Sequence, residues 1–173
     1  APIQVVLIPV AAHKTEAVME TIHEVNNRLK AIGIRTHVDD RDIRPGQKYY
    51  DWEIKGVPLR LDIGPRDVEN GNAFAARRTG GKHPLPISDI ESSVRSELTE
   101  IQATLLKASE EHRASIVRFA NNLSELDSEG AIFEVAFCGT DADAEVLEKS
   151  SGLTLLGEAL EPFAEPKPCI VSG

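Results

Sequence analysis

Apolar and polar residues follow two different rhythms along the first part of the chain. From Ile3 to Val10 the residues are nearly all apolar and several are β-branched, which predicts a strand buried on both faces. The next segment has apolar residues three or four positions apart, which predicts an amphipathic helix. Thr15 is placed to cap this helix, and Gly33 is placed to end it. Its apolar stripe consists of Val18, Ile22, Val25, Leu29 and Ile32.

Shorter elements follow up to residue 85. Residues 34–38 predict a second strand, and Pro45 begins a short helix that ends at Gly56. Residues 59–63 alternate apolar and polar side chains, which predicts a strand with one face in the core. The last strands of this part are expected at residues 72–78 and 83–85. The order strand, helix, strand, helix, strand is typical of an α/β fold, here a mixed, mainly parallel five-stranded sheet flanked by helices.

The second part of the chain begins with a long helix that Ser88 caps and that extends as far as Phe119. Its apolar stripe consists of Ile90, Val94, Leu98, Ile101 and Leu105. The elements expected after it are a strand at residues 131–138, a helix at 141–149 and a strand at 153–156. We therefore predict two domains, residues 1–122 with the long helix and a small α+β domain of residues 123–173.

Composition narrows the classes of function. The 173 residues suffice for one compact domain and a smaller second one, and the missing initial Met leads us to expect a piece of a longer protein. No apolar run approaches the roughly 20 residues of a membrane helix, and no signal peptide is visible. The 2 cysteines form no disulfide framework, which favours a reducing cytoplasm. Phosphate-binding glycine loops and a nucleophile paired with histidine are absent from the sequence, so we expect no catalytic residue and no cofactor in this chain.

Charge is distributed unevenly along the chain. The formal net charge is −9 at pH 7. Residues 35–82 hold 10 of the 19 basic and 8 of the 28 acidic residues, a net charge of +2, which leaves −11 for the rest. An acidic protein with one locally basic segment is expected to present its anion-binding surface there.

This basic segment contains the most specific motif of the chain. Residues 52–60 read Trp-Glu-Ile-Lys-Gly-Val-Pro-Leu-Arg, and residues 64–67 read Gly-Pro-Arg-Asp. The motif resembles the anticodon-binding domain of prolyl-tRNA synthetases of the form shared by archaea, eukaryotes and some bacteria. The resemblance extends from about Ile3 to Cys169. A related Gly-Val-Pro run occurs in threonyl, glycyl and histidyl synthetases, but the Trp-Glu before it and the ending at Cys169 favour the prolyl enzymes.

The resemblance implies a base-binding site. The residues that match the anticodon pocket of the family are Glu53, Arg60, Arg66 and Asp67. Every proline anticodon ends in two guanines, and guanine suits this set of side chains. A carboxylate accepts two N–H groups of its Watson–Crick edge, and a forked arginine donates to O6 and N7. Solvated ion pairs are the alternative interpretation of these charges, and for Asp67 so is a helix cap after the Gly-Pro turn.

Other basic residues of the segment are candidates for contacts with the RNA backbone, which position a nucleic acid without reading it. They are Arg41, Arg44, Lys48, Arg77, Arg78 and Lys82. The alternative is a solvated basic face. For Trp52 we favour packing between helix and sheet over a base-stacking role.

The C-terminal part raises the question of a metal. Members of the resembled family often hold zinc with four cysteines, and the matching positions here are Cys138, Asp143, Cys169 and Ser172. Structural zinc sites are usually closed by four Cys or His ligands. We therefore expect a degenerate module that binds no zinc.

The resemblance also implies what the longer protein does. It would be a cytoplasmic ligase of protein biosynthesis that joins proline to its tRNA with ATP and Mg²⁺. Its partners would be proline tRNA, a class II catalytic domain preceding Ala1 and a second copy of the enzyme, with no membrane or DNA partner. This chain alone would bind RNA and catalyse nothing. The alternatives are the same module from a threonyl, glycyl or histidyl synthetase, and a stand-alone regulatory or scaffold module of the same fold.

Overall fold

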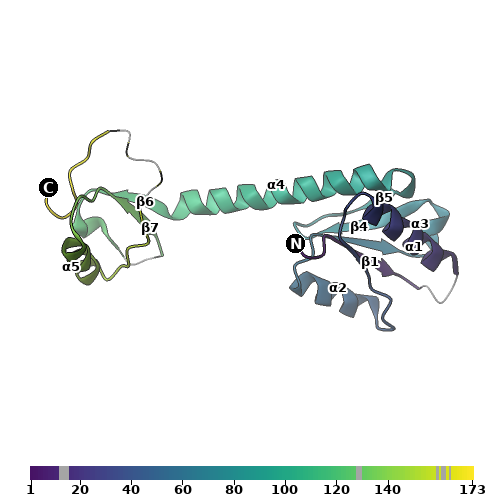
Figure 1. Ribbon diagram of the computed structural model, residues 1–173. Helices are drawn as coiled ribbons and strands as arrows, with labels where there is room; N and C mark the ends of the chain where they lie inside the picture. Colours follow the sequence, from purple (N-terminus) through teal and green to yellow (C-terminus); the bar gives the residue numbers. More distant parts are fainter. Residues whose placement is uncertain (12–15, 128–129, 159, 161–162, 164) are drawn as a thin grey trace. The chain divides into compact units, whose positions relative to one another are not determined.

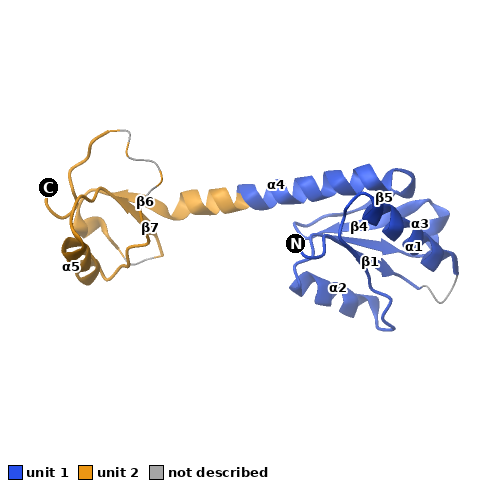
Figure 2. Ribbon diagram, in the orientation of Figure 1, with its two compact units in different colours: residues 1–107 blue, residues 108–173 orange. Residues whose placement is uncertain are grey.

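The computed structural model describes residues 1–11, 16–127, 130–158, 160, 163 and 165–173. The chain forms two compact units, residues 1–107 and 108–173 (Figure 2). The division lies inside the long helix α4 (Ile90–Ile116), N-terminal to the domain boundary expected at residues 122 and 123.

The first unit consists of a sheet with helices on its two faces (Figure 1). Its strands are β1 (Val5–Pro9), β2 (Thr36–Val38), β3 (Leu59–Ile63), β4 (Asn72–Arg77) and β5 (Lys82–Pro86). Its helices are α1 (Glu16–Ala31), α2 (Pro45–Ile54), α3 (Pro65–Glu69) and, after the 3-10 turn η2 (Ile87–Asp89), the first part of α4.

The strand order is β2-β1-β3-β4-β5. β1 pairs in parallel with β2 and β3, whereas β4 pairs antiparallel with β3 and β5, so only β4 runs against the other strands. This arrangement confirms the predicted mixed, mainly parallel sheet of an α/β fold. The register places Arg60 of β3 opposite Val6 of β1 on one side and opposite Ala76 of β4 on the other.

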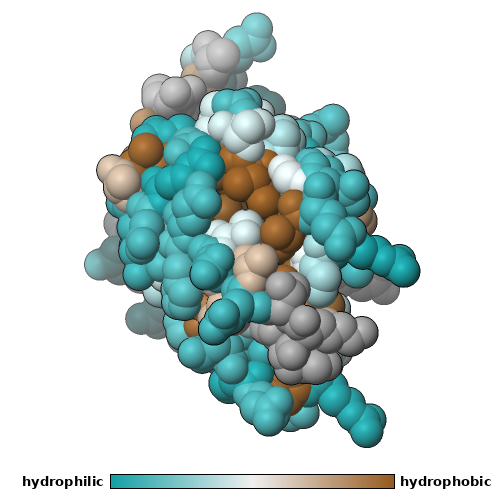
Figure 3. Space-filling view, turned by 90° about the vertical axis from the view of Figure 1, so that its right-hand side faces the viewer, coloured by the Kyte–Doolittle hydropathy of each residue, from teal (hydrophilic) through white to brown (hydrophobic). Residues whose placement is uncertain are grey.

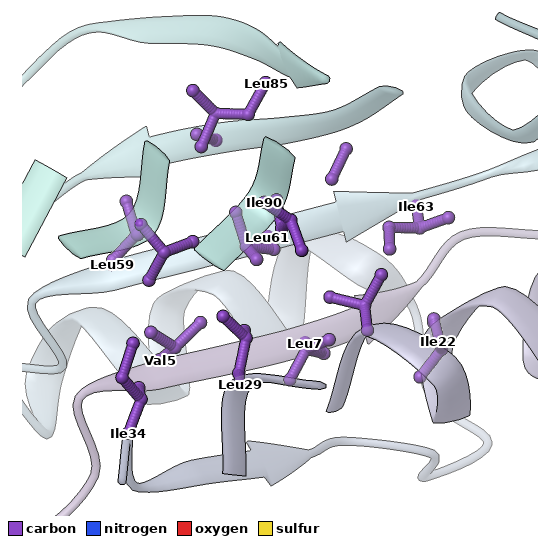
Figure 4. Packing of buried hydrophobic residues seen from close by; sticks show 14 of the residues in the cluster. Val5, Leu7, Ile22, Leu29, Ile34, Leu59, Leu61, Ile63, Leu85 and Ile90 are labelled. Carbon is purple, nitrogen blue, oxygen red and sulfur yellow. The ribbon is translucent and has the colours of Figure 1, made fainter. Parts of the chain in front are cut away.

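The main core lies on one face of this sheet. Val5 and Leu7 of β1 and Leu59 and Leu61 of β3 are fully buried there against α1 and the start of α4 (Figure 4). The apolar stripe predicted for α1 is buried as expected, except that Ile32 lies beyond the last helical residue, Ala31. The cap predicted at Thr15 lies outside the described residues.

The strand predicted at residues 59–63 with one face in the core is confirmed as β3. Its other face is buried as well, since every residue of the strand is buried. The alternation of apolar and polar side chains separates two buried faces of this strand. Leu59, Leu61 and Ile63 face the apolar core, while Arg60 and Asp62 lie on the face that α2 partly covers. A charged side chain at such a position needs partners, and they define the site described below.

The second unit contains β6 (Val117–Ala120), the 3-10 turn η3 (Leu123–Glu125), β7 (Ile132–Val135) and α5 (Asp141–Ser151). The long helix was expected to reach Phe119, but it ends at Ile116 and β6 pairs in parallel with β7. Isoleucine, valine and phenylalanine favour strands, which explains the early end. The helix expected at 141–149 is present, whereas residues 153–156 form no strand and expose Leu155 and Leu156.

Candidate nucleic-acid interface

A hollow of about 420 Å³ opens on the face of the first unit that carries α2. It is lined by residues of α2, β3 and the β4–β5 hairpin, and glycines 80 and 81 form part of its rim. Its charged lining residues are Glu53, Arg60, Arg77, Arg78 and Lys82. One acid among four bases gives this hollow the sign that attracts a phosphate-bearing ligand.

Arg60 lies at the centre of this arrangement. Its side chain is only 7% exposed, and its Nε donates to Asp62 Oδ1 at 3.1 Å. Nη1 lies 3.3 Å from Glu53 Oε1, and the guanidinium carbon lies 3.7 Å from the centroid of the Tyr49 ring. Nη2 is buried and has no hydrogen-bond partner among the described residues. The guanidinium is thus fixed on one face and one edge and retains donor capacity at its tip.

Burial also changes the acidity of the groups around Arg60. It raises the pKa of Asp62, and the nearby charge of Arg60 offsets part of this effect. Burial, and then the charge of Asp62, raises the pKa of Tyr49 to about 12. Tyr49 is therefore neutral at physiological pH, and its ring is a π face for the cation above it.

A second polar cluster fixes α2, which carries Glu53. The buried carboxylate of Asp39 follows β2 and accepts a hydrogen bond from Trp52 Nε1 at 2.7 Å. Arg41 donates to the same carboxylate through Nε at 2.9 Å and Nη2 at 2.8 Å. These bonds from Arg41 hold the pKa of Asp39 well below its usual range, although burial alone would raise it. Trp52 packs on Val6 and Ile8, which confirms its predicted packing role.

Comparison with known proteins assigns a family to this geometry. A family model described as "Anticodon binding domain" matches residues 4–97, more than half of the chain. The chain belongs to the anticodon-binding domain family. The matched region contains the sheet, α2 and the whole hollow.

Several curated relatives of this anticodon-binding domain are proline–tRNA ligases. The chain is 37% identical over 179 aligned positions to a proline–tRNA ligase of Methanocorpusculum labreanum, covering 100% of this chain and 38% of the relative. It is 48% identical over 131 positions to that of Methanococcus maripaludis, covering 73% of this chain and 28% of the relative. The chain thus spans well under half the length of the curated relatives that it matches.

A solved structure agrees with this relationship. The crystal structure of prolyl-tRNA synthetase from Cryptosporidium parvum complexed with halofuginone and AMPPNP superposes with a TM-score of 0.79 and 31% identity, covering 88% of this chain and 33% of that chain. The resemblance to prolyl-tRNA synthetases drawn from residues 52–67 is confirmed, and the threonyl, glycyl and histidyl alternative is not favoured.

The anticodon-binding domain brings together only part of the predicted base-reading set. Glu53 and Arg60 line the hollow, whereas Arg66 and Asp67 are not among the described residues that line it. Arg66 is exposed on α3, at the end of β3. Asp67 Oδ2 accepts the backbone N–H of Gly64 at 2.8 Å. One oxygen of this carboxylate therefore has the capping role of the alternative interpretation.

The candidates for backbone contacts also divide. Lys48 is only 4% exposed and donates through Nζ to the carbonyl of Asp39 at 3.0 Å, so it does not fit the predicted phosphate contact. Arg41 is engaged by Asp39 and Asp51. Arg77, with its side chain 20% exposed, pairs with Glu97 and Glu100 of α4. Arg44, Arg78 and Lys82 are exposed as well as Arg41 but form no ion pair within the described part of the chain, and the last two line the hollow.

Sequence reasoning missed the residues that hold the lining of the hollow in place. Asp39, Tyr49 and Asp62 each contact a residue that lines the hollow. The signal for Asp62 was present in the alternation of β3, which places it on the same face as Arg60. Asp39 gave no signal, because an acid after a short strand has no distinctive pattern.

The predicted degenerate zinc positions do not form a closed ligand set. Cys138 Sγ lies 4.0 Å from Ser172 Oγ. Asp143 caps α5, where Oδ2 accepts the Thr140 N–H at 2.7 Å and its hydroxyl at 2.9 Å. Across the described part of the chain, no three His, Cys, Asp or Glu side chains are grouped as a metal site requires. These residues do not fit a structural zinc ion, which needs four Cys or His ligands.

The face seen in Figure 3 is largely hydrophilic, with an apolar area between hydrophilic rims near its centre and smaller apolar spots elsewhere. Among the helices that the structure describes, none is both long and apolar enough to cross a membrane.

Proposed function

We propose that this domain binds the anticodon loop of proline tRNA and reads its two guanines. The observation that carries the proposal is the Glu53–Arg60 pair, whose Oε1 and Nη1 atoms are 3.3 Å apart at a basic hollow. Guanine presents the acceptor O6 beside the donor N1–H on its Watson–Crick edge, so an adjacent donor and acceptor are complementary to it. Adenine reverses this order, with a donor amino group beside the acceptor N1. Arg60 and Glu53 would then face groups of like kind.

The remaining members of the set extend this assignment. Arg66 and Asp67, at the end of β3, provide a second arginine and carboxylate for the other guanine. The exposed residues Arg44, Arg78 and Lys82 contact phosphates and set the position of the loop without reading it. Arg41 and Arg77 are each engaged by two carboxylates, so their predicted phosphate contacts are not part of this proposal.

In the longer protein, the domain would serve an ATP- and Mg²⁺-dependent proline–tRNA ligase of the cytoplasm. A class II catalytic domain would supply the chemistry and a second copy of the enzyme would complete a homodimer. The names of the relatives and the share of their length that this chain covers support this assignment. The chain would select the tRNA and contribute no catalytic residue.

Binding of anticodon stem-loops by the 173-residue chain tests the proposal. Three labelled RNAs are compared by fluorescence anisotropy, one with both guanines and two with adenine in place of either guanine. We expect the guanine loop to bind tighter by about 1–3 kcal/mol per base. Trp52, the only tryptophan, lines the hollow, and its fluorescence should report occupancy independently.

The matched control is Arg95→Ala, which removes an exposed cation from α4 on the other side of the sheet. It should leave the ratio between loops unchanged, whereas Arg60→Ala should relax discrimination at one guanine. Equal binding of all three loops by the wild-type chain would contradict base reading and leave only attraction by charge.

A further inference from the structure

Arg60 is held by two neighbouring side chains, those of Asp62 and Tyr49. The Nε of Arg60 donates to the two carboxylate oxygens of Asp62, at 3.1 and 3.3 Å. The Tyr49 ring covers one face of the guanidinium, with its centroid 3.7 Å from the guanidinium carbon. The charge of Asp62 also contributes to the raised pKa of Tyr49, so the two supports, one on α2 and one on β3, interact with each other. Together they fix both the plane and the rotation of the guanidinium about its own axis.

The groups left over by these contacts lie at the tip of the guanidinium. Nη1 meets only the exposed carboxylate of Glu53, whose side chain is 68% exposed, and Nη2 has no hydrogen-bond partner among the described residues. A buried donor without a partner is unfavourable, and such groups in native proteins call for an explanation. An incoming acceptor at the tip would satisfy it.

Asp62 itself is out of keeping with its neighbours. In the sheet it stands between Ile8 of β1 and Phe74 of β4, both apolar. Burial raises the pKa of its carboxyl group, which means that the folded protein disfavours the charge there. Replacing a buried ion pair as a whole by apolar residues is often neutral or stabilising. Stability alone therefore does not account for the Arg60–Asp62 pair at this position.

We propose that Asp62 and Tyr49 are positioning residues that hold Arg60 so that its Nη1 and Nη2 groups face the O6 and N7 edge of one guanine. The inference rests on the proposed function and assigns selectivity to residues that do not touch the base. A mobile arginine can donate to N7 of either purine, because guanine and adenine both present that acceptor. An arginine fixed beside Glu53 is matched to O6 and N1–H together, which only guanine offers. Preorganisation also lowers the entropy lost on binding.

The test compares discrimination, not affinity alone. Asp62→Asn keeps the shape of the side chain and an acceptor oxygen but removes the charge that orients Nε. We expect the ratio of affinities for the guanine loop over the adenine loop to fall about tenfold, mainly through weaker binding of the guanine loop. The matched control is Asp42→Asn, which also removes one negative charge, from an exposed position. It should strengthen both loops slightly and leave their ratio unchanged.

Tyr49 provides a second, independent pair of variants. Tyr49→Phe keeps the ring under the cation and loses only the hydroxyl, whereas Tyr49→Leu removes the π face. The ratio should fall little in the first and clearly in the second. Tyr49→Leu decides the question by itself if Asp62→Asn does not fold by circular dichroism. An unchanged ratio in Tyr49→Leu would then overturn the inference.

A double-mutant cycle separates this inference from the proposed function. If Asp62 acts through Arg60, Asp62→Asn should cause no further loss of discrimination in the Arg60→Ala background. A ratio that Arg60→Ala abolishes but Asp62→Asn leaves intact would overturn the role of Asp62 and leave guanine reading in place. A ratio that survives Arg60→Ala at both guanines would remove Arg60 as a reader and overturn this inference, while guanine reading by the domain would stand. Equal binding of guanine and adenine loops by the wild type, in contrast, would be a failure of the proposed function.

Discussion

The two units of this chain treat their polar residues differently. In the first, Asp39, Arg41 and Trp52 form one closed network, and Arg60 and Asp62 form another, each on a sheet whose opposite face is a large apolar core. In the second, Asp143 caps a helix and Cys138 is exposed, and the buried cluster consists, among described residues, of Ala120, Leu147 and Ile170. Charged groups can be held in fixed geometry only where a rigid core supports them. We therefore expect selective binding to be a property of the first unit.

Deletion of core volume should give the largest difference between the units. Leu61→Ala opens a cavity in the main core and should lower the free energy of unfolding by about 2–5 kcal/mol. Leu147→Ala should cost less, because its smaller cluster can collapse around the gap. Trp52 belongs to the first unit, so its fluorescence in urea reports that unit alone. We expect Leu61→Ala to shift this transition and Leu147→Ala to leave it in place. Equal shifts would mean that the two units unfold together and would break the comparison.

The closed network of Asp39 should make the first unit depend on pH. Because the pKa of Asp39 is lowered in the folded state, its contribution is present above its unfolded pKa of about 3.9 and is lost as pH falls below that value. Asp39→Asn should therefore cost about 1–3 kcal/mol at pH 7, and the gap from wild type should narrow in acid. Urea unfolding at several pH values measures it. A gap that stays constant with pH would show that shape, not charge, is what Asp39 contributes.

The contribution of Asp62, which lies in the same unit, should change stability with pH in the opposite direction. Its pKa is raised, so the folded state binds its proton more tightly than the unfolded chain, and stability rises as pH falls through the folded pKa. Asp62→Asn should be as stable as wild type or more stable at pH 7, with the advantage shrinking in acid. A large loss of stability at pH 7 would make Asp62 a structural residue in its own right.

The fold of the first unit could be predicted from the sequence because the periodicities of its apolar residues are strong. The apolar run from Ile3 to Val10 and the apolar stripe of α1 indicate which faces of these elements are buried. The motif at residues 52–67 indicates the family. The second unit was predicted less well. Its short segments carry weak patterns, so β6 was taken for the end of a helix, and a strand was expected at residues 153–156 where none is formed.

The candidate site was predicted by residue type but not by burial. Glu53 and Arg60 do meet at the hollow. Lys48 looked equally available in the sequence, yet it is turned inward to the carbonyl of Asp39. Which face of a short polar helix packs against the sheet depends on Trp52 and on its hydrogen bond across the chain to Asp39. Such a long-range partner leaves no local pattern.

Removal of exposed cations should have a smaller and different effect from removal of Arg60. Arg44→Ala and Arg78→Ala should each weaken all loops alike and reduce the dependence of log affinity on log salt by about 0.7, the value for one single-strand phosphate contact. The ratio between guanine and adenine loops should not change. Anisotropy titrations at several salt concentrations measure both quantities, with Arg95→Ala as the control of equal charge. A changed ratio in Arg78→Ala would mean that Arg78 helps to read the base and does not only contact the RNA backbone.

The smallest expected effect concerns metal in the second unit. A structural zinc ion supplies folding free energy, so a chelator unfolds a domain that depends on one. Here Asp143 has both of its contacts at the start of α5, and the position of Ser172 offers a hydroxyl in place of a thiolate. Zinc prefers thiolate and imidazole ligands, and the two cysteines alone would hold it weakly.

We expect EDTA to leave the melting temperature unchanged and elemental analysis to find well under one zinc ion per chain. Cys138→Ser should likewise leave the melting temperature unchanged, since the thiol of Cys138 is exposed. Stoichiometric zinc that survives dialysis, or a fall in melting temperature with EDTA that Cys138→Ser abolishes, would contradict this and give the second unit a fixed polar centre of its own.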